Sequence, residues 1–201
     1  AKRFSLRVEN VTAGNGSDEN LAFAIRAFCS KDKPLAFPDI TYGFYSVWAK
    51  LFGIPAKQIP LTDDFKINIE EYFNLNCTIV IANPNAPTGI SLSVDDIEKI
   101  VVNNPDGVVI IDEAYVDFGA ESCVPLINKY DNLLVVQTFS KSRSLAGARL
   151  GLAFGSKKLI ADINRVRYSF NPYNINRLTL LAGQAALNDE EYFSYCTQEI
   201  C

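Results

Sequence analysis

The chain contains no histidine, and this absence removes several classes of catalytic site. A Ser-His-Asp triad, a zinc site with histidine ligands and general acid–base catalysis by histidine are all excluded within these residues. Any proton transfer must therefore use a Lys, Tyr, Asp or Glu side chain.

Methionine is absent as well, so the chain begins at Ala1 without an initiator residue. Its last stretch, from Glu190 to Cys201, has the pattern of an unfinished helix. We therefore expect the sequence to be a piece of a longer polypeptide.

Long apolar runs and a large charge imbalance are also missing. No apolar run reaches the roughly 18 residues that a membrane-spanning helix requires, and no signal peptide is visible. The formal net charge of −4 gives no polybasic membrane signal and argues against nucleic acid as a partner. The composition, 48% hydrophobic over 201 residues, is typical of one globular domain with a substantial core.

The five cysteines are scattered and odd in number, and none has the spacing of a metal site. This pattern predicts reduced thiols in a cytoplasmic protein and argues against a disulfide scaffold.

Two kinds of apolar stretch alternate along the chain. Short apolar runs predict strands at 8–13, 34–37, 58–61, 78–82, 108–111, 133–137 and 150–154, and the run at 78–82 is rich in β-branched residues. Longer stretches with helical spacing predict helices at 20–29, 41–52, 93–102, 157–168 and 176–187. This alternation predicts an α/β fold with three αβα layers and a mainly parallel, mixed sheet.

The stretch from Thr138 to Gly151 reads T-F-S-K-S-R-S-L-A-G-A-R-L-G and follows a predicted buried strand. A lysine directly after such a strand is unusual, because burying its charge is costly unless something compensates. A Schiff base between Lys141 and an aldehyde cofactor would be one compensation. Arg149 follows among small residues that allow close approach. The alternative is a surface turn with a solvated Lys141 and Arg149.

Two other predicted strands also end in residues typical of a ligand site. The strand at 78–82 runs into N-P-N-A-P-T-G, and the strand at 108–111 runs into Asp112-Glu113-Ala114-Tyr115. Ligands of α/β proteins bind at the carboxyl ends of the strands. Asp112 is therefore a catalytic candidate, whereas we expect Glu113 to be a helix cap or a solvated turn residue.

A glycine-containing turn, G-N-G-S-D-E at 14–19, joins the first predicted strand to the first predicted helix. We expect Ser17 or Asp18 to cap that helix, and the free N–H groups of the turn to form an anion site. An ordinary capped helix is the alternative. A nucleotide-binding G-x-G-x-x-G loop is excluded, because position 19 is glutamate.

Together these motifs closely resemble those of the fold-type I pyridoxal-phosphate (PLP) aminotransferases. The resemblance rests on N-P-N-A-P-T-G, I-D-E-A-Y and F-S-K-S-R-S-L-A-G-A-R-L-G, with G-S-D-E and T-Y-G, and it covers the chain from about Val8 to Leu187. R-A-F-C, T-Y-G-F-Y and D-E-A-Y-V-D-F resemble the histidinol-phosphate aminotransferases within that family. Such enzymes convert histidinol phosphate and 2-oxoglutarate to imidazole acetol phosphate and glutamate, in histidine biosynthesis.

The resemblance implies three catalytic residues. Lys141 would bind the cofactor as a Schiff base and later move the substrate proton. Asp112 would pair with the pyridine nitrogen and keep it protonated, so that the ring can act as an electron sink. Tyr115 would donate a hydrogen bond to the phenolate oxygen of the cofactor.

The resemblance implies further cofactor contacts. Tyr42 would stack on the ring, and the phosphate would be bound by Ser140, Arg149 and the backbone amides of Ser17 and Asp18.

At one position the chain departs from the family pattern. Ala86 stands where an asparagine commonly contacts the phenolate oxygen, and the adjacent Asn85 is the candidate for that contact.

The resemblance also implies a domain organisation. Residues 1–188 would be the PLP-binding large domain, and 189–201 the start of a connecting helix toward a small domain. In the family that small domain supplies an arginine for the substrate carboxylate, and nothing after Leu187 resembles it. We therefore expect this chain alone to bind PLP weakly and to transaminate little. A homodimer with its site at the subunit interface, acting on small-molecule substrates, is implied as well.

Two alternative functions stay open at this point. Threonine-phosphate decarboxylases and other aminotransferases share most of these motifs. A domain of this fold could also bind or regulate without catalysis, although the retention of Asp112, Tyr115, Lys141 and Arg149 argues against lost chemistry.

Overall fold

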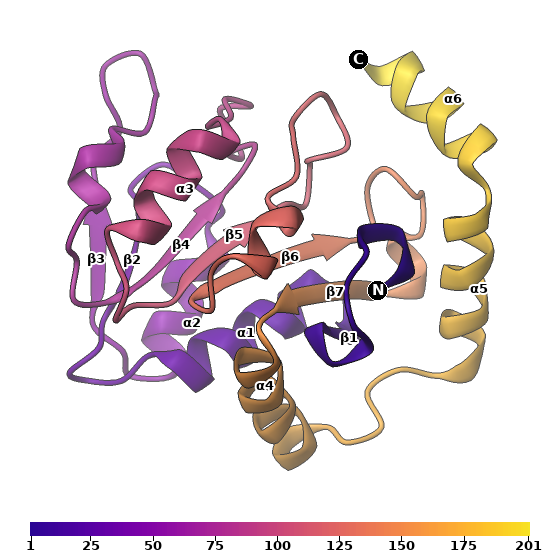
Figure 1. The fold of residues 1–201 in the computed structure, drawn as a ribbon, viewed down its shortest axis with the longest axis horizontal. Coiled ribbons are helices and arrows are strands. Elements are labelled where there is room, and N and C mark those ends of the chain that lie inside the picture. Colours follow the sequence, from indigo (N-terminus) through magenta and orange to yellow (C-terminus); the bar gives the residue numbers. More distant parts are fainter.

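The computed structural model describes all residues from Ala1 to Cys201 (Figure 1). Its centre is a seven-stranded sheet with the strand order β1-β7-β6-β5-β4-β2-β3. The strands are β1 (Val11–Asn15), β2 (Leu35–Pro38), β3 (Ala56–Ile59), β4 (Thr78–Ala82), β5 (Val109–Asp112), β6 (Leu133–Thr138) and β7 (Leu150–Gly155). All neighbours pair in parallel except β7, which is antiparallel to both β1 and β6. The predicted mainly parallel, mixed sheet is confirmed.

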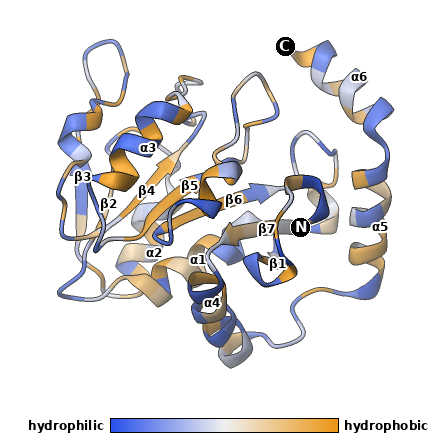
Figure 2. Ribbon diagram, viewed as in Figure 1, coloured by the Kyte–Doolittle hydropathy of each residue, from blue (hydrophilic) through white to orange (hydrophobic).

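Helices cover both faces of this sheet. One face packs against α1 (Ser17–Phe28), α2 (Phe44–Leu51) and α4 (Lys157–Phe170), and the other against α3 (Val94–Val102) (Figure 1). Alternate strand residues divide between the two cores: Ile79 and Ile81 lie on the α3 side, and Val80 lies on the α1 side. Figure 2 shows the apolar residues concentrated in the central strands. The result is the predicted three-layer αβα arrangement.

Two further helices, α5 (Arg177–Asn188) and α6 (Glu190–Ile200), run along one side of the molecule (Figure 1). They meet at Asp189, whose side chain accepts a hydrogen bond from the backbone N–H of Tyr192 and caps α6. No helix of the structure combines the length and the apolar character needed to cross a membrane.

The structure corrects the predicted boundaries near the N-terminus. Val8–Asn10 is a 3₁₀ turn, so β1 begins at Val11 rather than at residue 8. Helix α1 begins at Ser17 instead of residue 20, because Gly16, with a φ of 84°, is its N-cap. The predicted capping by the Ser17 or Asp18 side chain is wrong, since both residues lie in the first turn. No side chain caps α1, so no capping group competes for its first N–H groups.

The fold brings the ends of three parallel strands together. Strands β4, β5 and β6 end at Ala82, Asp112 and Thr138, and Asp112 is in register with Ala82 on one side and Val136 on the other. The N-terminus of α1 lies against β7 next to this edge. A Cβ atom on Gly151 would lie 2.3 Å from the backbone nitrogen of Ser17, so only glycine permits this approach.

Candidate active site

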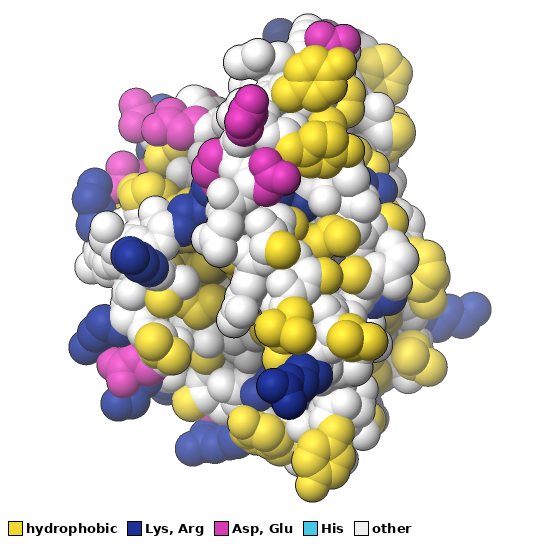
Figure 3. All heavy atoms as spheres, turned by 90° about the vertical axis from the view of Figure 1, so that its right-hand side faces the viewer, with side chains coloured by type: hydrophobic (Ala, Val, Ile, Leu, Met, Phe, Trp, Pro, Cys, Tyr) yellow, Lys and Arg dark blue, Asp and Glu magenta, His cyan; other side chains and the backbone are white.

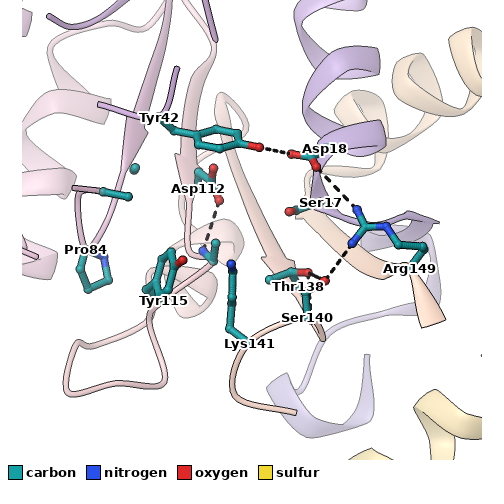
Figure 4. Close-up of a pocket in the computed structure, with 13 residues that line it drawn as sticks. Ser17, Asp18, Tyr42, Pro84, Asp112, Tyr115, Thr138, Ser140, Lys141 and Arg149 are labelled. Carbon is teal, nitrogen blue, oxygen red and sulfur yellow. Dashed lines mark hydrogen bonds and ion pairs between the residues drawn. The ribbon is translucent and has the colours of Figure 1, made fainter. Parts of the chain in front are cut away.

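A cavity of about 150 Å³ opens at the carboxyl ends of these strands (Figure 4). Eight of the nine predicted cofactor residues line it: Ser17, Asp18, Tyr42, Asp112, Tyr115, Ser140, Lys141 and Arg149. The other lining residues are Ala82, Pro84, Ala86, Ala114 and Thr138. Residues from five separate parts of the sequence therefore meet in one place.

One end of the cavity is suited to an anion. Arg149 donates from Nη1 to Ser140 Oγ at 3.2 Å, and its Nη2 lies 3.6 Å from Asp18 Oδ2. The Arg149 and Asp18 side chains are each 44% exposed, so this ion pair is weak and can exchange its partner. The uncapped N-terminus of α1 adds its dipole at Ser17. Figure 4 shows these four residues grouped on one side of the cavity.

The carboxylate of Asp112 lies elsewhere in the cavity and is 4% exposed. Its Oδ2 accepts a hydrogen bond from the Tyr45 hydroxyl at 2.8 Å, and its Oδ1 accepts one from the N–H of Ala114 at 3.2 Å. Burial raises the pKa of Asp112 to about 6, and the two hydrogen bonds oppose that rise. Asp112 is therefore ionised at neutral pH and can pair with a protonated ring nitrogen.

The amine of Lys141 lies beside Tyr115 in the cavity, with Nζ 5.0 Å from the centroid of the Tyr115 ring (Figure 4). The Lys141 side chain is exposed, which contradicts the idea that burial forces a compensating bond at this position. The strand before it is buried, but the chain turns outward after Phe139. Lys141 forms no ion pair, so its amine is available to a ligand.

Tyr42 forms part of the cavity wall. Its hydroxyl donates to Asp18 Oδ1 at 3.0 Å, and its ring meets the ring of Tyr45 edge-on, with centroids 5.6 Å apart. Burial, and then the neighbouring Asp18 carboxylate, raise the pKa of Tyr42 well above its usual value. The Tyr42 hydroxyl therefore stays protonated and acts as a donor.

Asn85 is the one predicted cofactor residue that the structure does not bring into the cavity. Its side chain accepts from Thr41 Oγ1 at 2.7 Å and donates to the Ile40 carbonyl at 3.0 Å and to Thr88 Oγ1 at 3.2 Å. Through these hydrogen bonds the Asn85 amide holds the 83–89 loop against residues 40 and 41. Ala86 lines the cavity instead and offers no polar group there.

Glu113 contradicts the expectation of a helix cap or a solvated residue, because it is 1% exposed. Successive residues at a strand end point to opposite faces, so Glu113 turns away from the cavity that Asp112 faces. Its carboxylate accepts from Gln137 Nε2 at 2.7 Å, Ser122 Oγ at 2.7 Å and the N–H of Cys123 at 2.5 Å. Burial raises the pKa of Glu113 to about 7, and these hydrogen bonds oppose the rise.

Sequence reasoning missed two residues next to the site. Tyr45 was not assigned to the site; it lies in the first turn of α2, three residues after Tyr42. Thr138 ends β6, where its hydroxyl donates to Ser140 Oγ at 3.0 Å and accepts from the N–H of Ser140 at 3.1 Å. A polar residue at the end of a buried strand was the available signal for Thr138.

Comparison with known proteins identifies the family. The family model "Aminotransferase class I and II" matches residues 1–199. The chain belongs to this aminotransferase family. Among its curated relatives, histidinol-phosphate aminotransferase of Brachyspira hyodysenteriae is 54% identical over 194 residues, which are 96% of this chain and 55% of that protein. The chain thus spans about half the length of the curated relatives it matches.

Solved aminotransferase structures share the fold. Histidinol-phosphate aminotransferase from Sinorhizobium meliloti, in complex with pyridoxal-5'-phosphate, has a TM-score of 0.90 at 23% identity and covers 100% of this chain and 56% of its own. L-threonine-O-3-phosphate decarboxylase from Porphyromonas gingivalis has a TM-score of 0.81 at 23% identity, with 96% and 57% covered. At these identities the likeness shows the fold alone, and the fold is common to two reactions.

Proposed function

We propose that the whole protein is a PLP-dependent aminotransferase that converts histidinol phosphate and 2-oxoglutarate to imidazole acetol phosphate and glutamate. The observation that carries this proposal is one cavity that joins Lys141, the buried Asp112 and an anion site at Arg149. The 54% identity to a histidinol-phosphate aminotransferase supports this substrate over others.

The residues of the cavity fit PLP chemically. Its phosphate would be bound by Arg149, Ser140 and the first turn of α1, where no side chain caps the helix. Asp112 would pair with the ring nitrogen, and Lys141 would hold the cofactor covalently. When bound, PLP supplies an electron sink for the electrons of a bond broken at the substrate Cα.

The residues of the chain divide the remaining work. Asp112, ionised at neutral pH, would hold a proton at the ring nitrogen. Once the substrate amine has displaced it from the cofactor, Lys141 Nζ would carry the proton between the substrate Cα and the reactive carbon of the cofactor. The Tyr115 hydroxyl would donate a hydrogen bond to the phenolate oxygen, and the Tyr42 ring would cover one face. With no histidine in the chain, Lys141 is the basic group best placed for proton transfer.

A covalent-labelling experiment tests the cofactor and the central lysine. The purified chain is mixed with PLP, reduced with borohydride, digested and mapped by mass spectrometry, alongside Lys141→Ala and Lys157→Ala. We expect the cofactor mass on Lys141 in the wild type and in Lys157→Ala, and no specific label in Lys141→Ala. If Lys141→Ala is labelled at another site to the wild-type extent, the role assigned to Lys141 is wrong.

A substrate comparison tests the reaction. The whole protein is incubated with PLP and either histidinol phosphate plus 2-oxoglutarate or threonine phosphate. We expect glutamate formation with the first pair and no carbon dioxide release from the second. Release of carbon dioxide from threonine phosphate would replace the aminotransferase proposal by the decarboxylase.

The proposal includes a cytoplasmic homodimer with small-molecule substrates, in which residues 1–188 form the large domain. Figure 3 shows hydrophobic side chains gathered on the face of α5 and α6, and exposed members there are Leu178, Leu180, Leu181, Tyr192 and Tyr195. Such a surface supports association. All five cysteines are free, as in a reducing compartment. Sedimentation of the whole protein as a monomer at micromolar concentration would contradict the dimer.

A further inference from the structure

Tyr45 does not line the cavity, but it forms a hydrogen bond with the Asp112 carboxylate, which does line it. It belongs to α2, is completely buried, and donates from its hydroxyl to Asp112 Oδ2 at 2.8 Å. The only other donor to this carboxylate is the backbone N–H of Ala114, on Oδ1. Tyr45 is therefore the one side chain that donates a hydrogen bond to Asp112.

The packing of the Tyr45 ring sets the position of its hydroxyl. Its ring lies among three aromatic rings, with centroid distances of 6.0 Å to Phe37, 5.6 Å to Tyr42 and 6.3 Å to Trp48. Burial, and then the Asp112 carboxylate, hold the pKa of Tyr45 well above its usual value. The hydroxyl is thus a permanent donor at a fixed point.

A fixed donor has two effects on a buried carboxylate. It selects one rotamer of Asp112, and it favours the ionised form over the protonated form. Because Asp112 is 4% exposed, water cannot supply an equivalent donor from every side. Only an ionised, oriented carboxylate can hold a proton on a ring nitrogen in the cavity.

We propose that Tyr45 is a positioning residue, which orients the Asp112 carboxylate toward the cavity and keeps it charged so that Asp112 can pair with the cofactor. The part of this proposal that concerns the cofactor rests on the proposed function. The part that concerns Asp112 itself does not, and it is measurable on the chain alone.

The test compares the wild type with Tyr45→Phe and with a matched control, Tyr72→Phe. Tyr72 is 1% exposed like Tyr45, but its hydroxyl has no hydrogen-bond partner within the chain. Each substitution removes one buried oxygen and leaves the ring in place. Only Tyr45→Phe removes a bond to Asp112.

The first readout is the titration of the Asp112 carboxyl carbon by ¹³C NMR without PLP. Losing a hydrogen bond to a charged group predicts a rise of roughly one pH unit in the pKa of Asp112 in Tyr45→Phe. Tyr72→Phe should titrate like the wild type. An Asp112 that titrates at the wild-type pH in Tyr45→Phe, or that shifts equally in both variants, overturns the proposal.

The second readout is PLP affinity at about pH 6.5 and about pH 9. We expect roughly tenfold weaker binding by Tyr45→Phe at the lower pH, where Asp112 takes up a proton, and a smaller loss at the higher pH. A loss of equal size at both values would indicate a merely structural role. In Asp112→Asn, adding Tyr45→Phe should weaken binding no further, and an independent loss would contradict action through Asp112.

The two proposals fail in different ways. If the wild type binds no PLP and Lys141 stays unlabelled, the proposed function fails, and the NMR titration still decides whether Tyr45 controls Asp112. If PLP binds Lys141 but Tyr45→Phe leaves Asp112 unchanged, the aminotransferase proposal stands and the role of Tyr45 is wrong.

Discussion

The guanidinium carbon of Arg143 lies 3.6 Å from the ring centroid of Phe193, and this contact joins the loop that carries Lys141 to helix α6. Arg143 also donates from Nη1 to the Ala186 carbonyl at 2.7 Å, and its Nη2 lies 3.3 Å from Glu190. Its side chain is only 7% exposed. The backbone next to Lys141 is thereby held in place, while the Lys141 side chain itself remains free to reach a ligand.

Arg143→Ala should loosen this loop. Loss of a desolvated cation–π contact and a charge-assisted hydrogen bond predicts a fall of about 2–3 kcal/mol in the free energy of unfolding. Urea denaturation measures that loss. Hydrogen–deuterium exchange should show faster exchange across residues 139–149. Arg143→Lys keeps the charge but not the planar fork, so it should recover only part of the stability.

The control for the Arg143→Ala experiment is an arginine that forms an ion pair at the surface. Arg165 is 81% exposed and pairs with Asp162 at 2.7 Å within α4. Arg165→Ala should change the unfolding free energy by less than about 0.5 kcal/mol and leave exchange in the 139–149 loop unchanged. A wild-type urea midpoint in Arg143→Ala would show that the contacts of Arg143 with Phe193, Ala186 and Glu190 do not stabilise the fold.

Gly16 and Arg149 also meet closely. Gly16 has a φ of 84°, and a Cβ atom there would lie 2.4 Å from Arg149 Nη2. Because a guanidinium is the end of a flexible side chain, Gly16→Ala should displace it from the anion site rather than block folding. We expect roughly tenfold weaker PLP binding, measured by absorbance titration, since one charge-assisted contact to the phosphate is lost.

Gly53→Ala separates backbone strain from displacement of Arg149. Gly53 also has a positive φ, of 65°, but a Cβ atom there would meet nothing within 4 Å. Both variants should lose about 1–2 kcal/mol of stability from the strained backbone, and only Gly16→Ala should lose affinity. Equal PLP affinity in the two variants would contradict the proposal that Arg149 binds the phosphate.

Local patterns account for what the sequence could predict. Strand β4 spans the predicted residues 78–82, because a β-branched run that is followed by a Pro-containing loop has few alternatives. Ser93 caps α3 as its position before Asp95 and Asp96 indicates, and its hydroxyl accepts from the N–H of Asp96. Since parallel strands end at one edge, motifs at strand ends could be assigned to one site before any contact was known.

Side-chain direction and partner choice account for what the sequence could not predict. The burial of Glu113 depends on Gln137, which lies 24 residues away and reaches it across the sheet. The direction of Asn85 depends on Thr41, 44 residues away in sequence. The bond from Tyr45 to Asp112 spans 67 residues. No local pattern encodes these pairings, because each is set by tertiary packing.

The buried Glu113 carboxylate makes the stability of the fold depend on pH. Burial raises its pKa from 4.5 to about 7, so the folded chain binds a proton that the unfolded chain releases. The free energy of unfolding should therefore fall as pH rises from about 4.5 to about 7, by up to on the order of 3 kcal/mol. Asp112, with its pKa raised to about 6, contributes in the same direction.

Glu113→Gln should flatten this pH dependence, because glutamine does not titrate and still accepts one of the three hydrogen bonds. Urea denaturation of the wild type and Glu113→Gln at about pH 5 and about pH 8 measures the difference between the two slopes. Glu70→Gln, at an exposed position, should keep the wild-type slope. Parallel profiles for the wild type and Glu113→Gln would mean that Glu113 stays ionised in the folded chain, held by Gln137, Ser122 and Cys123 strongly enough to offset its burial.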